Sequence, residues 1–163
     1  MIIGIDPGSR ITGYGIVKRV KSEVHYIAHG VVKTKSDTLA DKLNEIFVAI
    51  TQVIHDYQPT CAAIEQVFTS YNHQSALKLG QARGAAMTAL AHAGLAVDEY
   101  SAKQVKQAVV GYGGASKSQV QHMVRALLKM TETPVEDAAD ALAIAICHCN
   151  QQALKHKLSK SGV

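Results

Sequence analysis

The first third of the chain carries short runs of apolar and β-branched residues, which predict strands. We expect strands over residues 1–6, 12–20 and 24–33. The segment PGSR between the first two is typical of a tight turn, since Pro7 presets its backbone angle and Gly8 can take a positive one. The three strands should therefore form an antiparallel trio whose first two members make a hairpin.

Beyond residue 38 the apolar spacing becomes helical. Thr38 is placed to cap the start of this helix, and Pro59 lies beyond its end. The apolar face of the helix carries Leu39, Leu43, Ile46, Phe47, Ile50, Val53 and Ile54. The next segment, CAAIE at residues 61–65, is short and apolar up to its final acid, which is typical of a buried parallel strand.

The second half of the chain predicts one more strand and four helices. Residues 73–93 have helical spacing, and residues 95–100 form a short fifth strand. Three capping-box pairs predict helices that begin near residues 102, 117 and 134; they are Ser101 with Gln104, Ser116 with Gln119, and Thr133 with Glu136. Pro134 would occupy the first position of the last helix. This order predicts an α/β fold with a five-stranded mixed sheet flanked by α-helices.

Length and charge restrict the class of protein. The 163 residues, 47% of them hydrophobic, suit one domain, which we assign to residues 1–152, with a basic, flexible tail at residues 153–163. Lys and Arg exceed Asp and Glu by 17 − 13 = 4, which indicates an anionic partner, with nucleic acid ahead of membrane. No apolar run is long enough to span a bilayer, and the N-terminus lacks a signal pattern, so we expect a cytoplasmic protein.

Four acidic residues lie where the pattern predicts core elements. Asp6 and Glu65 end apolar strands that should be central neighbours, whereas Asp137 and Asp140 lie in the alanine-rich run EDAADALAIAICH. A spacing of three puts the last two on one helix face, about 4.5 Å apart along the axis. Buried carboxylates need partners or a cation, so if the four converge the sequence predicts a site for Mg²⁺ or Mn²⁺.

An all-carboxylate site suits phosphodiester chemistry. Two divalent ions about 4 Å apart can ionise an attacking water and stabilise the leaving oxygen, which fits a basic protein. The alternative for Asp137 is the ordinary preference of acids for the first turn of a helix, whereas Asp140 lies too deep for it. His148 is eight residues beyond Asp140, too far along the helix to share its ion. Three cysteines form no even framework and should be reduced core thiols: Cys61, Cys147 and Cys149.

Several residues are candidates for nucleic-acid contact. Phe68 follows Glu65 by three residues in a polar loop, where the ring could stack on a base or fold back onto the core. Five basic side chains could line a face that binds a nucleic-acid backbone, although each taken singly is an ordinary solvated charge: Arg10, Lys103, Lys106, Lys117 and Arg125.

Two glycine-rich segments suggest nucleotide binding, but each falls short of the motif. GYGGASKS has Ser116 in place of the second glycine of a phosphate loop, so we interpret it as a hinge into the capping box. DPGSRITGYG resembles the phosphate-binding hairpin of actin-like ATPases and sugar kinases, which need two such domains. In the helix over residues 73–93, Ala76, Gly80 and Gly84 share a face that would pack on a second copy or on the protein's own sheet.

Six segments between residues 2 and 148 match one known family in order: IGIDPGSRITGYG, AAIEQVF, SALKLGQARGAA, QVKQAVVGYG, KSQVQHMV and EDAADALAIAICH. On these segments the chain closely resembles the RuvC family of Holliday junction resolvases. The resemblance implies an RNase H-like fold, a homodimer, and Mg²⁺-dependent paired nicking of four-way DNA junctions that leaves 5′-phosphates and 3′-hydroxyls. It also implies junction-binding and branch-migrating motor proteins as partners.

The resemblance assigns roles to particular residues. It puts the family's catalytic acids on Asp6, Glu65, Asp137 and Asp140, its base-contacting aromatic on Phe68, and its DNA-contacting lysines on Lys106 and Lys117. Some relatives carry histidine where this chain has Asp137, so whether that residue is a ligand or a base stays open. Two other classes also stay open: a nucleotide-dependent phosphotransferase, which needs an adenine pocket, and a noncatalytic module that binds four-way DNA without nicking it.

Overall fold

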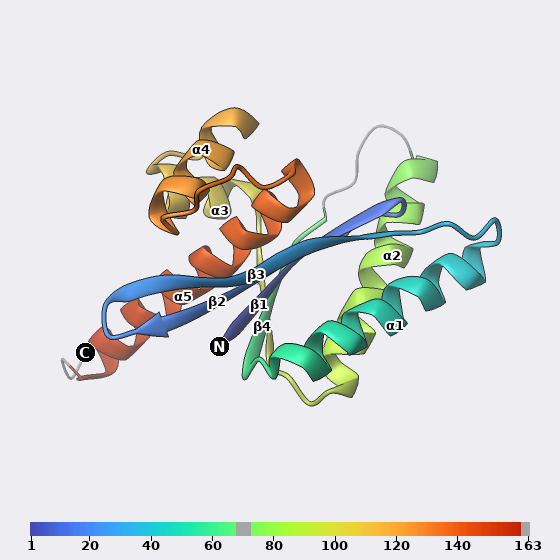
Figure 1. Cartoon of the computed structure of the whole chain (residues 1–163), viewed down its shortest axis with the longest axis horizontal. Coiled ribbons are helices and arrows are strands. Elements are labelled where there is room, and N and C mark those ends of the chain that lie inside the picture. Colours follow the sequence, from blue (N-terminus) through green and yellow to red (C-terminus); the bar gives the residue numbers. More distant parts are fainter. Residues whose placement is uncertain (68–72, 161–163) are drawn as a thin grey trace.

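A computed structural model describes residues 1–67 and 73–160 and arranges them around one mixed sheet (Figure 1). The described strands are β1 (Ile2–Asp6), β2 (Ile11–Val20), β3 (Glu23–Lys33), β4 (Cys61–Glu65) and β5 (Val97–Tyr100), in the order β3-β2-β1-β4-β5. β2 is antiparallel to both β1 and β3, whereas β1–β4 and β4–β5 are parallel. The predicted hairpin, parallel central pair and five-stranded mixed sheet are confirmed.

Helices cover both faces of this sheet (Figure 1). One face carries α1 (Leu39–Tyr57) and α2 (His73–His92). The other carries α3 (Ala102–Val110), α4 (Lys117–Leu127) and α5 (Glu136–Lys160). Side chains alternate along β1, so Ile3 and Ile5 pack with α1 and α2, whereas Ile2 packs with α5.

The predicted helix starts are confirmed for three of the helices. Thr38 caps α1 by accepting a hydrogen bond from the main-chain nitrogen of Asp41. Both reciprocal bonds of the capping box are present at Ser101 in α3 and at Ser116 in α4. The glycine-rich segment before Ser116 is therefore a connection between two capped helices.

The last helix begins two residues later than expected, and the predicted capping box and first-turn proline at its start are wrong. α5 begins at Glu136, and the main-chain nitrogen of Ala139 bonds to the carbonyl of Val135, so Pro134 lies outside the helix. Thr133 is therefore not the capping residue, and the Glu136 carboxylate pairs with Lys117 of α4. The helix continues to Lys160, through most of the segment that the sequence assigned to a basic tail. Its later residues include Ala, Leu, Gln and Lys, which favour helix strongly even where exposed.

Two glycines allow the chain to approach itself closely near the acids. A Cβ atom on Gly4 of β1 would lie 2.2 Å from the carbonyl oxygen of Ala141, so α5 rests directly on the sheet. Gly8 does not take the positive φ expected of its turn; a Cβ there would lie 2.1 Å from the carbonyl oxygen of Ile11. Glycine is needed at both positions for space rather than for an unusual backbone angle.

Candidate active site

Asp6 and Glu65 lie side by side at the carboxyl ends of parallel strands. Ile5 of β1 is in register with Ile64 of β4, which puts the two acids next to each other. Gly4 and Ala63 face α5, and the two-residue period of a strand places Asp6 and Glu65 on that same face. The edge of an α/β sheet where parallel strands end is a common position for chemistry.

The first turns of α5 bring the other two acids to this edge. Gly13 of β2 pairs with Asp6, and a Cβ on Gly13 would lie 2.0 Å from the carbonyl oxygen of Asp137. The start of α5 therefore crosses the hairpin directly beside Asp6. Asp137 and Asp140 are both partly buried there, one helical turn apart.

The acids in this cluster affect one another's ionisation. Burial, followed by the charges of Glu65, Asp140 and Asp137, raises the pKa of Asp6 to about 8. Burial and the charge of Asp140 also raise the pKa of Glu65, although Lys117 and Lys106 oppose that shift. The pKa of Asp140 is raised as well, mainly by burial. Burial and mutual repulsion therefore favour protonation of these acids, or binding of a cation, over free carboxylates.

The donor atoms suit a hard divalent ion, because they are all carboxylate oxygens. Within residues 1–67 and 73–160, however, no three His, Cys, Asp or Glu side chains are grouped so that they could hold an ion as they stand. A hydrogen bond joins the carboxyl groups of Asp6 and Glu65 instead. The residues fit a hard cation by their chemistry, since a cation could replace the proton that these two acids share.

Two lysines face the cluster from α3 and α4. A pocket of about 200 Å³ is lined by Glu65 and Asp140 together with Lys106 and Lys117. Lys117 also forms an ion pair with Glu136, at the start of α5, and the hydrogen bond to that carboxylate raises the pKa of Lys117. The sequence suggested that this lysine is free to reach DNA; in the structure it would have to exchange Glu136 for a phosphate.

The other predicted contact residues lie elsewhere. Lys103 lies on α3 but does not line the pocket that holds Lys106. Arg125, near the opposite end of α4 from Lys117, donates from Nε to the carbonyl of Met130. Arg10 lines a separate groove against α1 and α2. Phe68 lies outside the described residues.

Sequence reasoning missed Arg83, which lies on α2. Its Nε donates to the main-chain carbonyl oxygen of Glu65 at 2.8 Å, and its guanidinium pairs with Glu99 of β5. This arginine lies in SALKLGQARGAA, one of the segments that carry the family resemblance, but the resemblance assigned no role to it. Its role depends on how α2 packs against the end of β4, which the sequence does not reveal.

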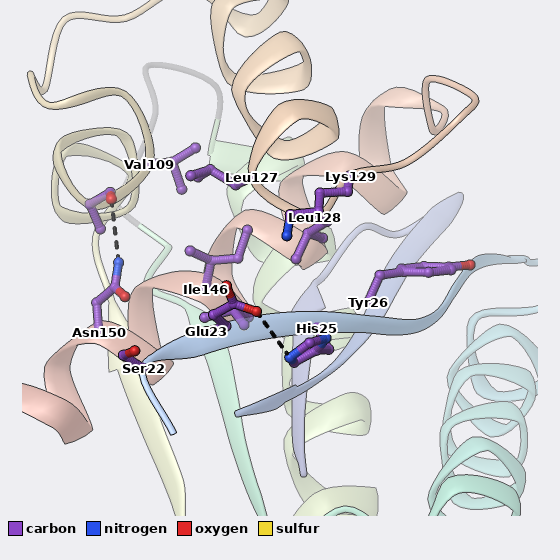
Figure 2. Close-up of a pocket in the computed structure, with 12 residues that line it drawn as sticks. Ser22, Glu23, His25, Tyr26, Val109, Leu127, Leu128, Lys129, Ile146 and Asn150 are labelled. Atoms are coloured by element: carbon purple, nitrogen blue, oxygen red, sulfur yellow. Dashed lines mark hydrogen bonds and ion pairs between the residues drawn. The ribbon is translucent and has the colours of Figure 1, made fainter. Parts of the chain in front are cut away.

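A larger cavity, of about 530 Å³, lies at the opposite end of the sheet. Figure 2 shows Leu127, Leu128 and Ile146 around it, with Glu23 paired to His25. Its titratable residues come from the β2–β3 end and the segment after α4. The cavity therefore lacks the convergent carboxylates of the smaller pocket, and size alone does not identify the site.

The exposed face of α2 carries the two glycines that the sequence singled out. Nothing lies within 4 Å of a Cβ built on Gly80 or on Gly84, and both residues are exposed. α2 instead packs on the sheet through Ala82, Ala86 and Leu90. Packing of these glycines on the protein's own sheet, one of the two alternatives, is therefore excluded.

The remaining chemistry-bearing residues are structural. The described cysteines are free, and Cys147 and Cys149 are buried as expected. His148 is only 1% exposed; its Nδ1 bonds to the hydroxyl of Tyr100 at 2.9 Å, while Nε2 has no partner among the described residues. None of the helices in the part of the chain that the structure describes has the length and apolar character to cross a membrane.

Comparisons with known proteins agree with this geometry. Residues 2–148 match the family described as "Crossover junction endodeoxyribonuclease RuvC". The protein of that name from Coxiella burnetii is 57% identical over 161 residues, which are 99% of this chain and 94% of the relative. The one from Francisella tularensis is 55% identical over 159 residues, covering 98% and 93%.

A solved structure extends the likeness to three dimensions. Thermus thermophilus RuvC in complex with a Holliday junction substrate superposes with a TM-score of 0.87 at 34% identity, over 94% of this chain and 95% of that one. A second structure of Thermus thermophilus RuvC gives a TM-score of 0.84, also at 34% identity. The RNase H-like fold that the sequence resemblance implied is confirmed.

Proposed function

The chain belongs to the RuvC family of crossover junction endodeoxyribonucleases, and from that premise we propose that it resolves four-way DNA junctions by hydrolysing phosphodiester bonds. The observation that carries the proposal is the group of acids at the ends of β1 and β4, which share a proton and face two lysines. A nucleotide-dependent phosphotransferase and a noncatalytic junction-binding module are both disfavoured, because the family consists of nucleases.

The four acids are the proposed ligands of the family's divalent metal, for which Mg²⁺ is our choice and Mn²⁺ a substitute. Asp6 and Glu65 would bind from adjacent strands, and Asp140 from α5, once the proton between the first two is released. Asp137 would serve as a fourth ligand or as a base. When bound, a pair of ions supplies an ionised water and neutralises the leaving oxygen.

The chain's own residues then act on the substrate. Lys106 and Lys117 would bind phosphate oxygens next to the bond that breaks, and Glu136 would release Lys117 as DNA enters. Water adds to phosphorus and the bond to the 3′ oxygen breaks, which leaves a 5′-phosphate and a 3′-hydroxyl. Phe68, three residues beyond Glu65, is proposed to stack on a base at the junction.

Paired nicking requires a second site, so we propose a homodimer. One site cuts one strand at a time, whereas a two-fold dimer presents two sites to a nearly two-fold junction. The exposed face of α2 is the proposed contact, because Gly80 and Gly84 leave room for another helix to approach closely. Junction-binding and branch-migrating motor proteins are the proposed partners in the cell.

The proposal is tested with a labelled four-way junction and a linear duplex of the same arms. In Mg²⁺ the purified protein should nick two opposed strands of the junction and leave the duplex intact, and chelation of the metal should stop the reaction. Ligation of the nicked products without further processing would show the 5′-phosphate and 3′-hydroxyl ends. Bound but uncut junction in Mg²⁺ and in Mn²⁺ would contradict the proposal.

A further inference from the structure

A second concave surface lies on the face of the sheet that α1 and α2 cover. It is a groove of about 460 Å³, and we call it the α1–α2 groove. It lies between the turn that joins β1 to β2 and the first turns of the two helices, where Figure 1 shows the tip of the hairpin close to α2. Three of its lining residues are cations and one is an acid: Arg10, Lys42 and Lys78 against Asp37.

The cations of the α1–α2 groove have no ion-pair partner in the part of the chain that the structure describes. Among residues 1–67 and 73–160, neither Arg10, Lys42 nor Lys78 forms an ion pair, even though Asp37 lines the same groove. Lys117, by contrast, is paired with Glu136. Cations that converge on one concavity without partners are arranged to receive an anion from outside, because like charges gathered there repel one another.

The walls of the groove are held by hydrogen bonds rather than left as loose loops. Thr34 donates from Oγ1 to the carbonyl of Ser9 and from its main-chain nitrogen to the carbonyl of Arg10, each at 3.1 Å. Farther along, Glu45 of α1 accepts from the main-chain nitrogen of Ser36 at 3.1 Å. The turn that carries Arg10 is thus tied to the segment that leads into α1, the helix that carries Lys42.

The groove also lies beside the acids. Arg10 is four residues beyond Asp6, in the turn that follows β1. Lys106 and Lys117 approach the acids from α3 and α4, whereas Lys42 and Lys78 lie on α1 and α2 across the sheet. The acidic end of the sheet is therefore flanked by cations on both faces.

We propose that the α1–α2 groove binds backbone phosphates of a second segment of the junction DNA, apart from the segment that Lys106 and Lys117 hold at the acids. This inference rests on the proposed function and names a further part of its substrate-binding surface. DNA is the occupant that the protein's substrate supplies, and cations that three separate segments contribute to one groove suit successive phosphates of a backbone rather than a single small anion.

The test compares two double variants of the full chain that each lose two positive charges. Lys42→Gln with Lys78→Gln empties the groove of its lysines. Lys18→Gln with Lys129→Gln is the matched control, since both residues are exposed and lie toward the other end of the sheet. Junction affinity is measured without divalent metal over a range of salt concentrations, and thermal unfolding verifies that both variants fold.

The groove variant should bind the junction about tenfold more weakly than the parent. The slope of log affinity against log salt concentration should be shallower by about 2, because each lost phosphate contact removes about 0.9 from that slope. Lys78→Glu alone should weaken binding at least as much as Lys78→Gln. The control should keep the parent slope. Equal slopes in all three proteins, or equal losses in groove variant and control, would overturn the inference. A parent that neither binds nor nicks junctions would instead overturn the proposed function.

Discussion

Arg83 on α2 donates a hydrogen bond from Nε to the main-chain carbonyl oxygen of Glu65 at 2.8 Å, and its guanidinium also pairs with Glu99. The same strand end is fixed from β5, where the carbonyl of Tyr100 accepts from the main-chain nitrogen of Gln66 at 2.8 Å. Arg83 therefore connects the helix of the proposed dimer contact to the strand that carries a proposed metal ligand.

Arg83→Gln should weaken Mg²⁺ affinity by about 10- to 100-fold, the usual cost of losing a residue that orients a metal ligand. The expected sign is a higher Mg²⁺ concentration for half-maximal nicking, because the residue acts through Glu65 and does not touch the substrate. Glu99→Gln is the control, since it removes the ion pair but leaves Nε bonded to Glu65. An unchanged Mg²⁺ dependence in Arg83→Gln would show that Arg83 only stabilises packing.

The raised pKa of Asp6 predicts how stability depends on pH without metal. The folded protein keeps the Asp6 proton up to about pH 8, whereas the unfolded chain releases it near the ordinary value of 3.8. Between those values the folded state binds more protons, so its free energy of unfolding falls as the pH rises. The contribution of the Asp6 proton to the free energy of unfolding is fully present below the pKa of the unfolded chain. It is lost once the pH has risen through the pKa of the folded protein.

Thermal unfolding in a chelator, at pH values across that window, measures this effect. Asp6→Asn should flatten the decline, since the amide does not titrate. Mg²⁺ should raise the melting temperature more near the upper end of the window than near the lower, because the ion competes with fewer protons there. If the parent protein in chelator became steadily more stable as the pH rises across this window, the raised pKa of Asp6 would be contradicted.

A side chain added at an exposed glycine of α2 should have a different effect from one added where α5 rests on the sheet. Gly84→Leu should leave the fold intact, because nothing lies within 4 Å of its Cβ, yet it should block the proposed dimer. Gly4→Ala should destabilise the fold by about 1 to 3 kcal/mol, since its Cβ would meet the carbonyl oxygen of Ala141. Sedimentation of Gly84→Leu should show a folded monomer, and the labelled-junction assay should show single rather than paired nicks. A parent protein that sediments as a monomer, alone and on junction DNA, would remove the dimer from the account.

Much of this architecture could be predicted from local patterns. The hairpin, the buried strand before Glu65 and the caps at Thr38, Ser101 and Ser116 depend on residues near one another in the chain, so their signals survive in the sequence. The position of Asp6 and Glu65 at the ends of neighbouring central strands was predicted from the same local patterns. These elements came out within one or two residues of their observed bounds.

Contacts between distant segments could not be predicted in this way. Glu136 pairs with Lys117, which is 19 residues away, and does not complete the capping box expected with Thr133. The bond from Arg83 to Glu65 and the groove that joins Arg10 to Lys78 also arise only when helices pack on the sheet. The sequence around a charged residue does not indicate which distant side chain or carbonyl group it will contact.

The central claim is that the acids at the sheet edge form a metal-dependent nuclease site, and Asp140→Asn tests it most directly. The variant should bind the labelled junction at least as well as the parent, because it carries one less negative charge toward phosphate. Its nicking rate in Mg²⁺ should fall by more than about 100-fold, beyond the cost of losing a merely supporting residue. Asp56→Asn, an exposed acid near the end of α1, should nick like the parent. If Asp140→Asn folds, binds and nicks within about threefold of the parent, a barrier change under 1 kcal/mol, the proposed site is wrong.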